Sequence, residues 1–394
     1  MQGKKKIAAA GHICLDITPV FPANTAGTVA EILKPGRLLH MDGVDVHTGG
    51  SAANTGLALK LMGADVRILG KVGEDTFGRI VGAVLEQHGV RHGLIRDAQG
   101  STSYSVILAV PGTDRIFLHD AGTNDTYGPE DISEEALEGL DLFHFGYPPL
   151  MRRMYEKEGR ELEEIFRKVK ARGIPVSLDM AAVDEASPAG SADWEKILRR
   201  ILPLVDVFLP SVEELLFMAD REAYRKLVQR AAGRDVTEAT DIRQDVAPLA
   251  EKMLEWGAKN VLIKCGSMGL YFASCGVEKQ RELQAVMGLD AEAWAGKRLF
   301  ERSFRPERIC SGTGAGDTCI AAFLMGMLLG KTPEECVRLA AAQGACCVEA
   351  YDALGGAADD GRAGEEDWRG MGEELKRKFC RYKVQIFEKQ EVSF

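Results

Sequence analysis

The chain has 394 residues, of which 45% are hydrophobic and 27% charged, a composition typical of a folded globular protein. Its formal net charge of -10 argues against nucleic acid as a main partner, because binding to phosphate backbones needs basic surface. The basic residues 1–6 precede only a short apolar run at 7–10, and no run is long enough to span a bilayer. We therefore expect a cytoplasmic protein that does not bind membranes.

Short β-rich apolar runs alternate with helical segments along most of the chain. Residues 7–14 are predicted as a buried first strand, 49–62 as a turn and helix, and 65–69 as the next strand. Later strands are predicted, each after a helical segment, at 142–145, 176–179, 205–209 and 261–265. This alternation predicts an α/β protein whose mostly parallel sheet carries helices on both faces, as one domain over 1–394.

Two segments interrupt the alternation. Residues 101–121 are predicted to form a β-hairpin, and residues 18–48 are β-like and turn-rich with no predicted helix. Together they predict a small antiparallel sheet, a lid over the carboxyl ends of the main strands, where ligands bind in open α/β sheets. Asn124 follows the hairpin and is predicted to mark its hinge. An exposed lid edge needs a strand partner, so we expect a homodimer through the lids.

Three further segments are predicted to be additions to the core. Residues 221–245 are charged and helix-prone, and residues 276–307 show little periodicity. Residues 355–372 are rich in Gly, Asp and Glu and are predicted as a loop.

The stretch Ser311-Gly312-Thr313-Gly314-Ala315-Gly316-Asp317 carries the clearest chemical signal. The small residues 314–316 precede an apolar helix, so their N–H groups lie at the positive end of its dipole and can approach a phosphate closely. A carboxylate beside a phosphate is unfavourable unless it takes a proton from an attacking hydroxyl. The stretch therefore predicts phosphoryl transfer with Asp317 as the base, the alternative being a plain turn that Asp317 caps.

Two common phosphate-binding motifs do not fit this stretch. A dinucleotide fingerprint that begins at Gly312 would need glycine at Asp317, and a P-loop would need Gly-Lys-Ser or Gly-Lys-Thr after the loop.

The turn and its apolar helix resemble the second signature of the ribokinase-like (PfkB) carbohydrate kinases. Gly49-Gly50 with Asn54 resembles the first signature of that family, and residues 71–78 match its G-x-D-x-x-G segment. The resemblance extends from about residue 6 to 356. It implies a three-layer sandwich with a β-sheet lid, and transfer of the ATP γ-phosphate to a sugar-type hydroxyl with Mg²⁺.

The resemblance also implies roles for individual residues. Asp317 takes the place of the catalytic base, and Gly314, Ala315 and Gly316 that of the anion hole. The substrate-binding residues implied or suggested by strand ends are Asp16, Gly49, Gly50, Asn54, Tyr147 and Asp179. The ATP-binding residues implied are Ser211, Lys264, Gly266, Ser267, Gly269 and Thr313, with Glu214 near the metal.

The chain departs from the family pattern in the glycine turn, in the Asn-x-x-Glu element and at Ala341, which aligns roughly with an Asn that is common in the late helix. Ser311 and Gly312 stand where many members have Asp-Thr, which puts the monovalent-cation site of potassium-activated members in doubt. Ser211 replaces the usual Asn of the Asn-x-x-Glu element and lacks its amide.

Several alternatives stay open on the substrate side. Tyr147 either stacks on a sugar or base or packs in the core. A nucleoside kinase of the same fold is therefore one alternative, and a non-catalytic sugar or nucleotide binding protein is another.

Overall fold

A computed structural model describes residues 4–111, 115–307, 309 and 312–349, and its strands form two main sheets. The large sheet has nine strands within these residues, and its neighbours run parallel from β6 to β13. At the other edge, β14 and β15 are antiparallel. The order across the sheet is β15 (Arg298–Arg302), β14 (Gly269–Ser274), β13 (Asn260–Lys264), β12 (Val207–Phe208), β11 (Val176–Leu178), β10 (Leu142–Gly146), β1 (Lys6–Gly11), β4 (Asp65–Leu69) and β6 (Arg91–His92).

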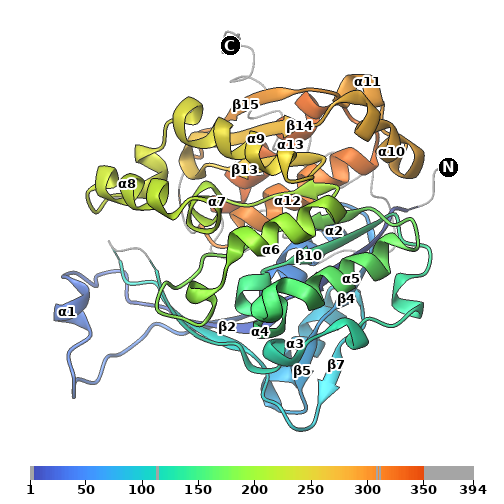
Figure 1. Cartoon of the computed structure of the whole chain (residues 1–394). Coiled ribbons are helices and arrows are strands. Elements are labelled where there is room, and N and C mark those ends of the chain that lie inside the picture. The colour runs from blue at the N-terminus through green and yellow to red at the C-terminus, as the bar shows by residue number, and fades with distance from the viewer. Residues whose placement is uncertain (1–3, 112–114, 308, 310–311, 350–394) are drawn as a thin grey trace.

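The large sheet is buried on both faces, as the strand β1 illustrates. Ile7 and Ala9 belong to one hydrophobic cluster, whereas Ala8 and Ala10 belong to the other, because successive side chains of a strand point to opposite faces. The first face is covered by α2 (Ser51–Leu61), α3 (Thr76–Gln87), α10 (Val277–Met287), α12 (Ala315–Leu328) and α13 (Pro333–Val348). The second is covered by α5 (Arg160–Lys170), α6 (Trp194–Ile201), α7 (Val212–Ala219) and α9 (Ala247–Glu255). The result is the three-layer sandwich that was predicted (Figure 1).

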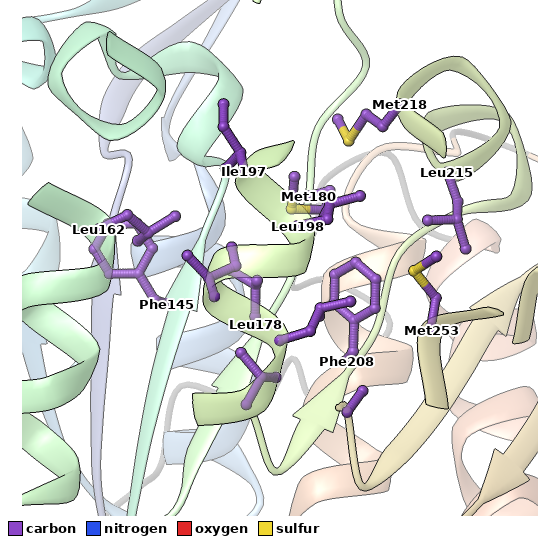
Figure 2. Close-up of a cluster of buried hydrophobic side chains, with 14 of the residues drawn as sticks. Phe145, Leu162, Leu178, Met180, Ile197, Leu198, Phe208, Leu215, Met218 and Met253 are labelled. Atoms are coloured by element: carbon purple, nitrogen blue, oxygen red, sulfur yellow. The ribbon is translucent and has the colours of Figure 1, made fainter. Parts of the chain in front are cut away.

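The second-face cluster joins strands and helices that are distant in the sequence. Figure 2 shows Phe145 of β10 near Leu162 of α5, and Phe208 of β12 among side chains from α6, α7 and α9. This packing holds the carboxyl ends of β10 to β13 in fixed relation.

The smaller sheet consists of β3 (Val44–Gly49), β2 (Cys14–Pro19), β8 (Tyr104–Leu108) and β9 (Ile116–Asp120), in that order. The predicted hairpin is present as β8 and β9. The prediction of a wholly antiparallel lid is wrong, because β2 and β8 pair in parallel. β2 follows β1 of the large sheet, whereas β8 follows β7 (Ile95–Asp97), which pairs with β5 (Lys71–Gly73) in a separate two-stranded sheet.

Two predicted segments near the N-terminus differ in the structure. The predicted first strand is two strands, because the chain turns at Gly11, whose φ is 111° and where a Cβ would lie 2.3 Å from the Gly146 carbonyl oxygen. The predicted helix-free segment contains the short helix α1 (Val29–Ile32), with a capping box formed by Thr28 and Glu31. Figure 1 shows α1 projecting away from the body.

Residues 276–307 are more regular than predicted. They form α10, α11 (Ala291–Trp294) and the edge strand β15 of the large sheet. The buried residues Leu283, Met287 and Trp294 anchor this segment. Most of its other side chains are polar and exposed, and this hid the helical period in the sequence.

Residues 221–245 contain α8 (Arg221–Ala231) and two further short helical turns, as the helix-prone sequence predicted. Residues 355–372 lie outside the described residues. In the described part of the chain, none of the helices has the length and apolarity needed to cross a membrane.

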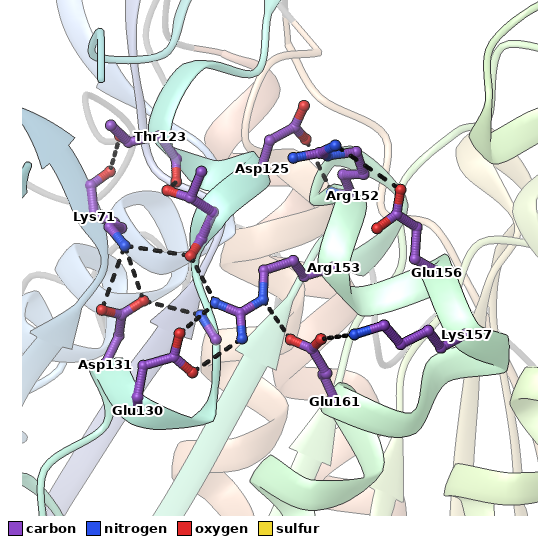
Figure 3. Close-up of polar contacts among 12 residues, drawn as sticks. Lys71, Thr123, Asp125, Glu130, Asp131, Arg152, Arg153, Glu156, Lys157 and Glu161 are labelled. Carbon is purple, nitrogen blue, oxygen red and sulfur yellow. Dashed lines mark hydrogen bonds and ion pairs between the residues drawn. The ribbon is translucent and has the colours of Figure 1, made fainter. Parts of the chain in front are cut away.

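A polar network fixes the segment that follows the small sheet (Figure 3). Lys71 forms an ion pair with Asp131 at 3.3 Å, and Arg153 pairs with both Glu130 and Glu161. The backbone N–H of Arg152 also donates to Asp125 at 2.9 Å. Residues 125–131 are therefore held against α5 and α4 (Arg152–Tyr155). The segment that follows the small sheet is thus fixed to the body of the protein.

Candidate active site

Most of the predicted site residues lie at one edge of the large sheet. Parallel strands end at the same edge, and β1, β10, β11 and β13 place His12, Tyr147, Asp179 and Lys264 there. The start of α12 brings Asp317 to the same edge, through the hydrogen bond of this carboxylate to Tyr147. Residues from five separate parts of the chain therefore meet in one place.

The glycine turn leads directly into α12. Gly314 is its N-cap with a φ of 74°, a left-handed conformation that favours glycine, and the helix begins at Ala315. The first N–H groups of an α-helix have no acceptor within the helix, so those of Ala315 and Gly316 lie at its positive end. A Cβ placed on Gly316 would lie 3.6 Å from the Lys264 Nζ atom, so this ammonium group borders the turn.

Asp317 is 2% exposed and accepts hydrogen bonds from three side chains. Asn54 Nδ2 donates to Oδ2 at 3.0 Å, Thr55 Oγ1 donates to Oδ1 at 3.2 Å, and the Tyr147 hydroxyl donates at 3.0 Å. Burial raises the pKa of Asp317, and the three donors together with Lys264 counteract that shift. The carboxylate is thus held in one orientation with its basicity increased.

Tyr147 has an unusual backbone at the end of β10. Its φ of 62° is left-handed, which is rare for a residue with a large side chain, and it directs the hydroxyl at Asp317. Its ring is 6.2 Å from that of His12. Packing in the core and contact with a ligand were the two predicted roles of Tyr147, and a hydrogen bond to Asp317 was not foreseen.

The double-glycine turn brings two other side chains close to the backbone. A Cβ on Gly49 would lie 2.2 Å from a carboxylate oxygen of Asp16, and one on Gly50 would lie 2.6 Å from Nδ1 of His12. Both positions therefore require glycine for space. Burial raises the pKa of Asp16, and the Cys14 thiol donates to it at 3.2 Å.

Asp179 and Lys264 form a buried ion pair. Their Oδ1 and Nζ atoms are 2.7 Å apart, and Asp179 is fully buried. Burial raises the pKa of Asp179 and disfavours the charged lysine, yet Asp179 and Glu214 hold the pKa of Lys264 above its ordinary value. We regard the pair as ionised, because the short contact is a charge-assisted hydrogen bond. Asp179 thus positions Lys264, and the predicted contact of Asp179 with substrate stays a prediction.

Comparisons with known proteins assign the chain to a family. Residues 5–357 match the family described as pfkB family carbohydrate kinase. The chain belongs to the pfkB family of carbohydrate kinases. It is similar to an uncharacterised sugar kinase of Archaeoglobus fulgidus, with 27% identity over 302 residues that cover 76% of this chain and 98% of the relative. It is also similar to a ribokinase of Arabidopsis thaliana, with 26% identity over 310 residues, 78% of this chain and 68% of that one.

Solved structures agree on the fold of this pfkB-family kinase. A putative ribokinase II from E. coli, in complex with ATP and Mg²⁺, superposes with a TM-score of 0.66 at 18% identity, covering 96% of this chain and 99% of that one. The solved structure shows the ribokinase-like fold, and the family match shows that the protein is an ATP-dependent carbohydrate kinase.

Several of the predicted ATP-binding residues lie around the end of β13. Gly266 and Ser267 form a single 3-10 turn that leads into β14 at Gly269. A Cβ on Gly266 would lie 2.6 Å from the Thr237 hydroxyl, and one on Gly269 would lie 2.0 Å from the Glu301 carbonyl oxygen. Packing within the protein already requires both glycines, so their predicted contacts with ATP stay predictions.

Glu214 has a structural partner that the family comparison did not indicate. The Ser211 N–H donates to its Oε2 at 2.7 Å, and the Ser211 hydroxyl accepts from the Glu214 N–H at 3.2 Å, a capping box at the start of α7. The described residues contain no cluster of three metal-ligating side chains. Mg²⁺ in kinases usually keeps several waters and binds one or two carboxylates plus phosphates. A site with Glu214 as its single carboxylate therefore fits this ion.

Two hydrogen-bonded contacts near the site involve the small sheet and the segments next to it. Arg115, directly before β9, donates a hydrogen bond to the Thr313 hydroxyl in the glycine turn. Asn124 is fully buried, donates to the Ile13 carbonyl oxygen at 2.9 Å and accepts from the Ile13 N–H at 3.2 Å. Asn124 thus fixes the chain between β1 and β2, and its predicted role as the hinge stays a prediction. Ser311, on which the expectation about monovalent cations depends, lies outside the described residues.

Sequence reasoning missed three residues of the site: Thr55, Arg115 and His12. Thr55 directly follows Asn54 in α2, but successive helix residues do not face each other, so only the structure shows that both side chains reach Asp317. His12 directly follows β1, so its place at a strand end was a signal that went unused, whereas nothing in the local sequence around Arg115 pointed to the site.

Proposed function

We propose that this sugar kinase transfers the γ-phosphoryl group of ATP to a substrate hydroxyl with Asp317 as the general base. The observation that carries the proposal is the buried Asp317 carboxylate, held by Asn54, Thr55 and Tyr147 at the positive end of α12. A carboxylate with a raised pKa is a suitable proton acceptor, because catalytic bases work best when their pKa lies near the operating pH.

The reaction follows from this geometry. The substrate hydroxyl gives its proton to Asp317 while its oxygen forms a bond to the γ-phosphorus, and the bond from that phosphorus to the bridging oxygen of ADP breaks. The N–H groups of Gly314, Ala315 and Gly316 stabilise the negative charge on the transferred group. Lys264, held by Asp179, adds a fixed positive charge beside the turn. When Mg²⁺ is bound with ATP, it neutralises phosphate charge, and Glu214 is the residue that would hold it.

The direct test is an assay of ATP-dependent phosphorylation with pentoses, hexoses, sugar acids and nucleosides. We expect ADP release that depends on one of these acceptors, with the phosphorylated product identified by mass spectrometry. Binding of ATP without transfer to any acceptor would contradict the proposal and favour a non-catalytic binding protein. Phosphorylation of nucleosides alone would favour the nucleoside kinase.

Tyr147→Phe is expected to move the acid limb of the pH profile to higher pH. The Tyr147 hydroxyl stabilises the charged form of Asp317 and lowers its pKa, so its removal raises that pKa. More of the base is then protonated at a given pH, and kcat/KM starts to fall at a higher pH. The measurement is kcat/KM as a function of pH for both proteins. Tyr155→Phe, in α4 next to Trp194, is the control and should leave the limb in place.

We also propose a homodimer through the lids. Val44 and Val46 on β3 and Phe117 and Leu118 on β9 are large apolar side chains that are exposed on the two edge strands of the small sheet. Exposed apolar edge strands favour pairing with another strand. A dimer of this kind would cover these side chains.

A further inference from the structure

His12 is a buried histidine without a hydrogen-bond partner. The side chain is 2% exposed, and neither Nδ1 nor Nε2 has a partner among the described residues. Its backbone is held on both sides, because its N–H donates to the Gly146 carbonyl oxygen and its own carbonyl oxygen accepts from the Ala52 N–H, both at 3.2 Å. Buried polar side chains are nearly always paired, so two free nitrogens on a rigidly placed ring need an explanation.

The His12 imidazole is one of a circle of groups around the proposed sugar site. The circle consists of His12, Tyr147, Asp317, Asn54, Gly50, Gly49 and Asp16. Asp16 lies against Gly49, and His12 lies against Gly50, the next residue. The His12 ring faces the Tyr147 ring at 6.2 Å, and Tyr147 bonds to Asp317. Asp317 bonds to Asn54, whose backbone N–H returns to the Gly50 carbonyl oxygen at 2.9 Å. His12 thus lies against the predicted sugar-binding turn and is connected to the proposed base through Tyr147.

His12 and the nearby lid histidine both favour the neutral form. Burial lowers the pKa of His12, and His119, whose ring is 5.1 Å away, lowers it further. Burial also lowers the pKa of His119. A neutral imidazole offers one N–H donor and one acceptor nitrogen, which is the pairing that a hydroxyl group or two adjacent hydroxyls can satisfy.

The charges around the circle disfavour an anionic substrate. Asp16 and Asp317 are both carboxylates, and an acidic group bound between them would be repelled. Lys264 is engaged by Asp179 at 2.7 Å, and Arg115 contacts Thr313 in the glycine turn, on the phosphate side. A sugar acid or a sugar phosphate needs a cation of its own. The basic side chains next to His12 and Asp16 are histidines, His119 and the cross-strand His47, and burial lowers the pKa of His119.

We propose that His12 is a specificity-determining residue that hydrogen-bonds a substrate hydroxyl, and that the acceptor is an uncharged polyhydroxy compound, a free sugar or a nucleoside. This inference rests on the proposed function, because it assumes that the acceptor binds next to Asp317. It excludes sugar acids and sugar phosphates as preferred substrates.

The test compares His12→Phe with His12→Asn. Phenylalanine keeps a flat ring but has no nitrogen, whereas asparagine keeps one donor and one acceptor. We expect His12→Phe to raise the KM for the preferred neutral sugar about 10-fold or more, the size of effect expected when neutral hydrogen bonds in a binding site are lost. His12→Asn should recover part of the loss, and the KM for ATP should change less than twofold in both.

His144→Phe is the matched control. His144 is also buried and neutral, but Ser51 at 3.2 Å and Ser177 at 3.0 Å already occupy its two nitrogens. Its substitution should lower the thermal unfolding midpoint without a selective change in the KM for the sugar. A sugar KM within twofold of wild type in His12→Phe would overturn the role of His12.

A calorimetric measurement of sugar binding keeps this test independent of turnover. The panel is a free aldose, a free ketose, a nucleoside, a sugar acid and a sugar phosphate. If the neutral compounds bind and their affinity is lower in His12→Phe, the inference is supported even without product formation. Absence of product would then contradict the proposed function alone. Preference for the acid or the phosphate, in binding or in turnover, overturns the neutral class and leaves the role of Asp317 intact.

Discussion

Asp317→Asn is expected to lower kcat at least about 100-fold, since a positioned general base contributes roughly 10²–10⁴-fold to rate. An amide cannot accept the proton of the attacking hydroxyl, yet it fills the same space between Asn54, Thr55 and Tyr147. ATP binding should persist, because the glycine turn and Lys264 are unchanged. The measurements are kcat with the preferred sugar and the dissociation constant for ATP.

The same variant has a predicted signature in stability. The folded-state pKa of Asp317 is raised above that of the unfolded chain, so the folded protein binds more protons between these two values. Wild-type stability therefore falls relative to that of the variant as pH rises from about 4 through the raised pKa. Thermal unfolding of both proteins across this range would reveal the difference.

The control for this substitution is Asp206→Asn. Asp206 is equally buried but precedes β12, at the opposite edge of the sheet, where Lys170 and Lys259 pair with it. The Asp206→Asn substitution should leave kcat close to that of the wild-type enzyme. If Asp317→Asn kept more than about a tenth of wild-type kcat, another group would have to be the base.

Lys264→Met is expected to lower both activity and stability. It removes the positive charge beside the glycine turn, and it leaves the fully buried Asp179 carboxylate without its partner. Breaking a buried ion pair on one side destabilises a protein by about 3–5 kcal/mol. We expect a higher KM for ATP, a lower kcat and a clearly lower unfolding midpoint in denaturant.

A second variant separates the two effects. In Lys264→Met with Asp179→Leu, no unpaired charge is left, so most of the stability should return while activity stays low. Lys170→Met is the control, because Asp206 retains Lys259 at 3.1 Å. Full activity in the stable double variant would show that Lys264 has only a structural role.

Local sequence patterns were sufficient wherever the chemistry lies in one short segment. The glycine turn, the double-glycine helix and the alternation of strands and helices are all contiguous, and each has a local physical cause. The segments that differed had weaker local signals. The strand break at Gly11 depends on the Gly146 carbonyl oxygen, and the helices of residues 276–307 carry few apolar residues.

The arrangement of the site could not be predicted in the same way, because its contacts join distant residues. Asn54 and Asp317 are 263 positions apart, and Tyr147 and Asp317 are 170 apart. A sequence shows that Asp179 and Lys264 each follow a strand, but their pairing depends on the strand order. The protonation states of His12 and Asp317 depend on burial, which only the packed structure defines.

The sequence by itself determined the family of this protein and the residue types of its predicted phosphate-binding turn, because close approach to a phosphate needs small residues at the start of a helix. The tertiary structure decided which side chains surround Asp317 and which charges they carry. It also placed the unpaired His12 beside the predicted sugar-binding turn. Those features arise from several strands ending at one edge of a sheet, and no single segment of the chain contains them.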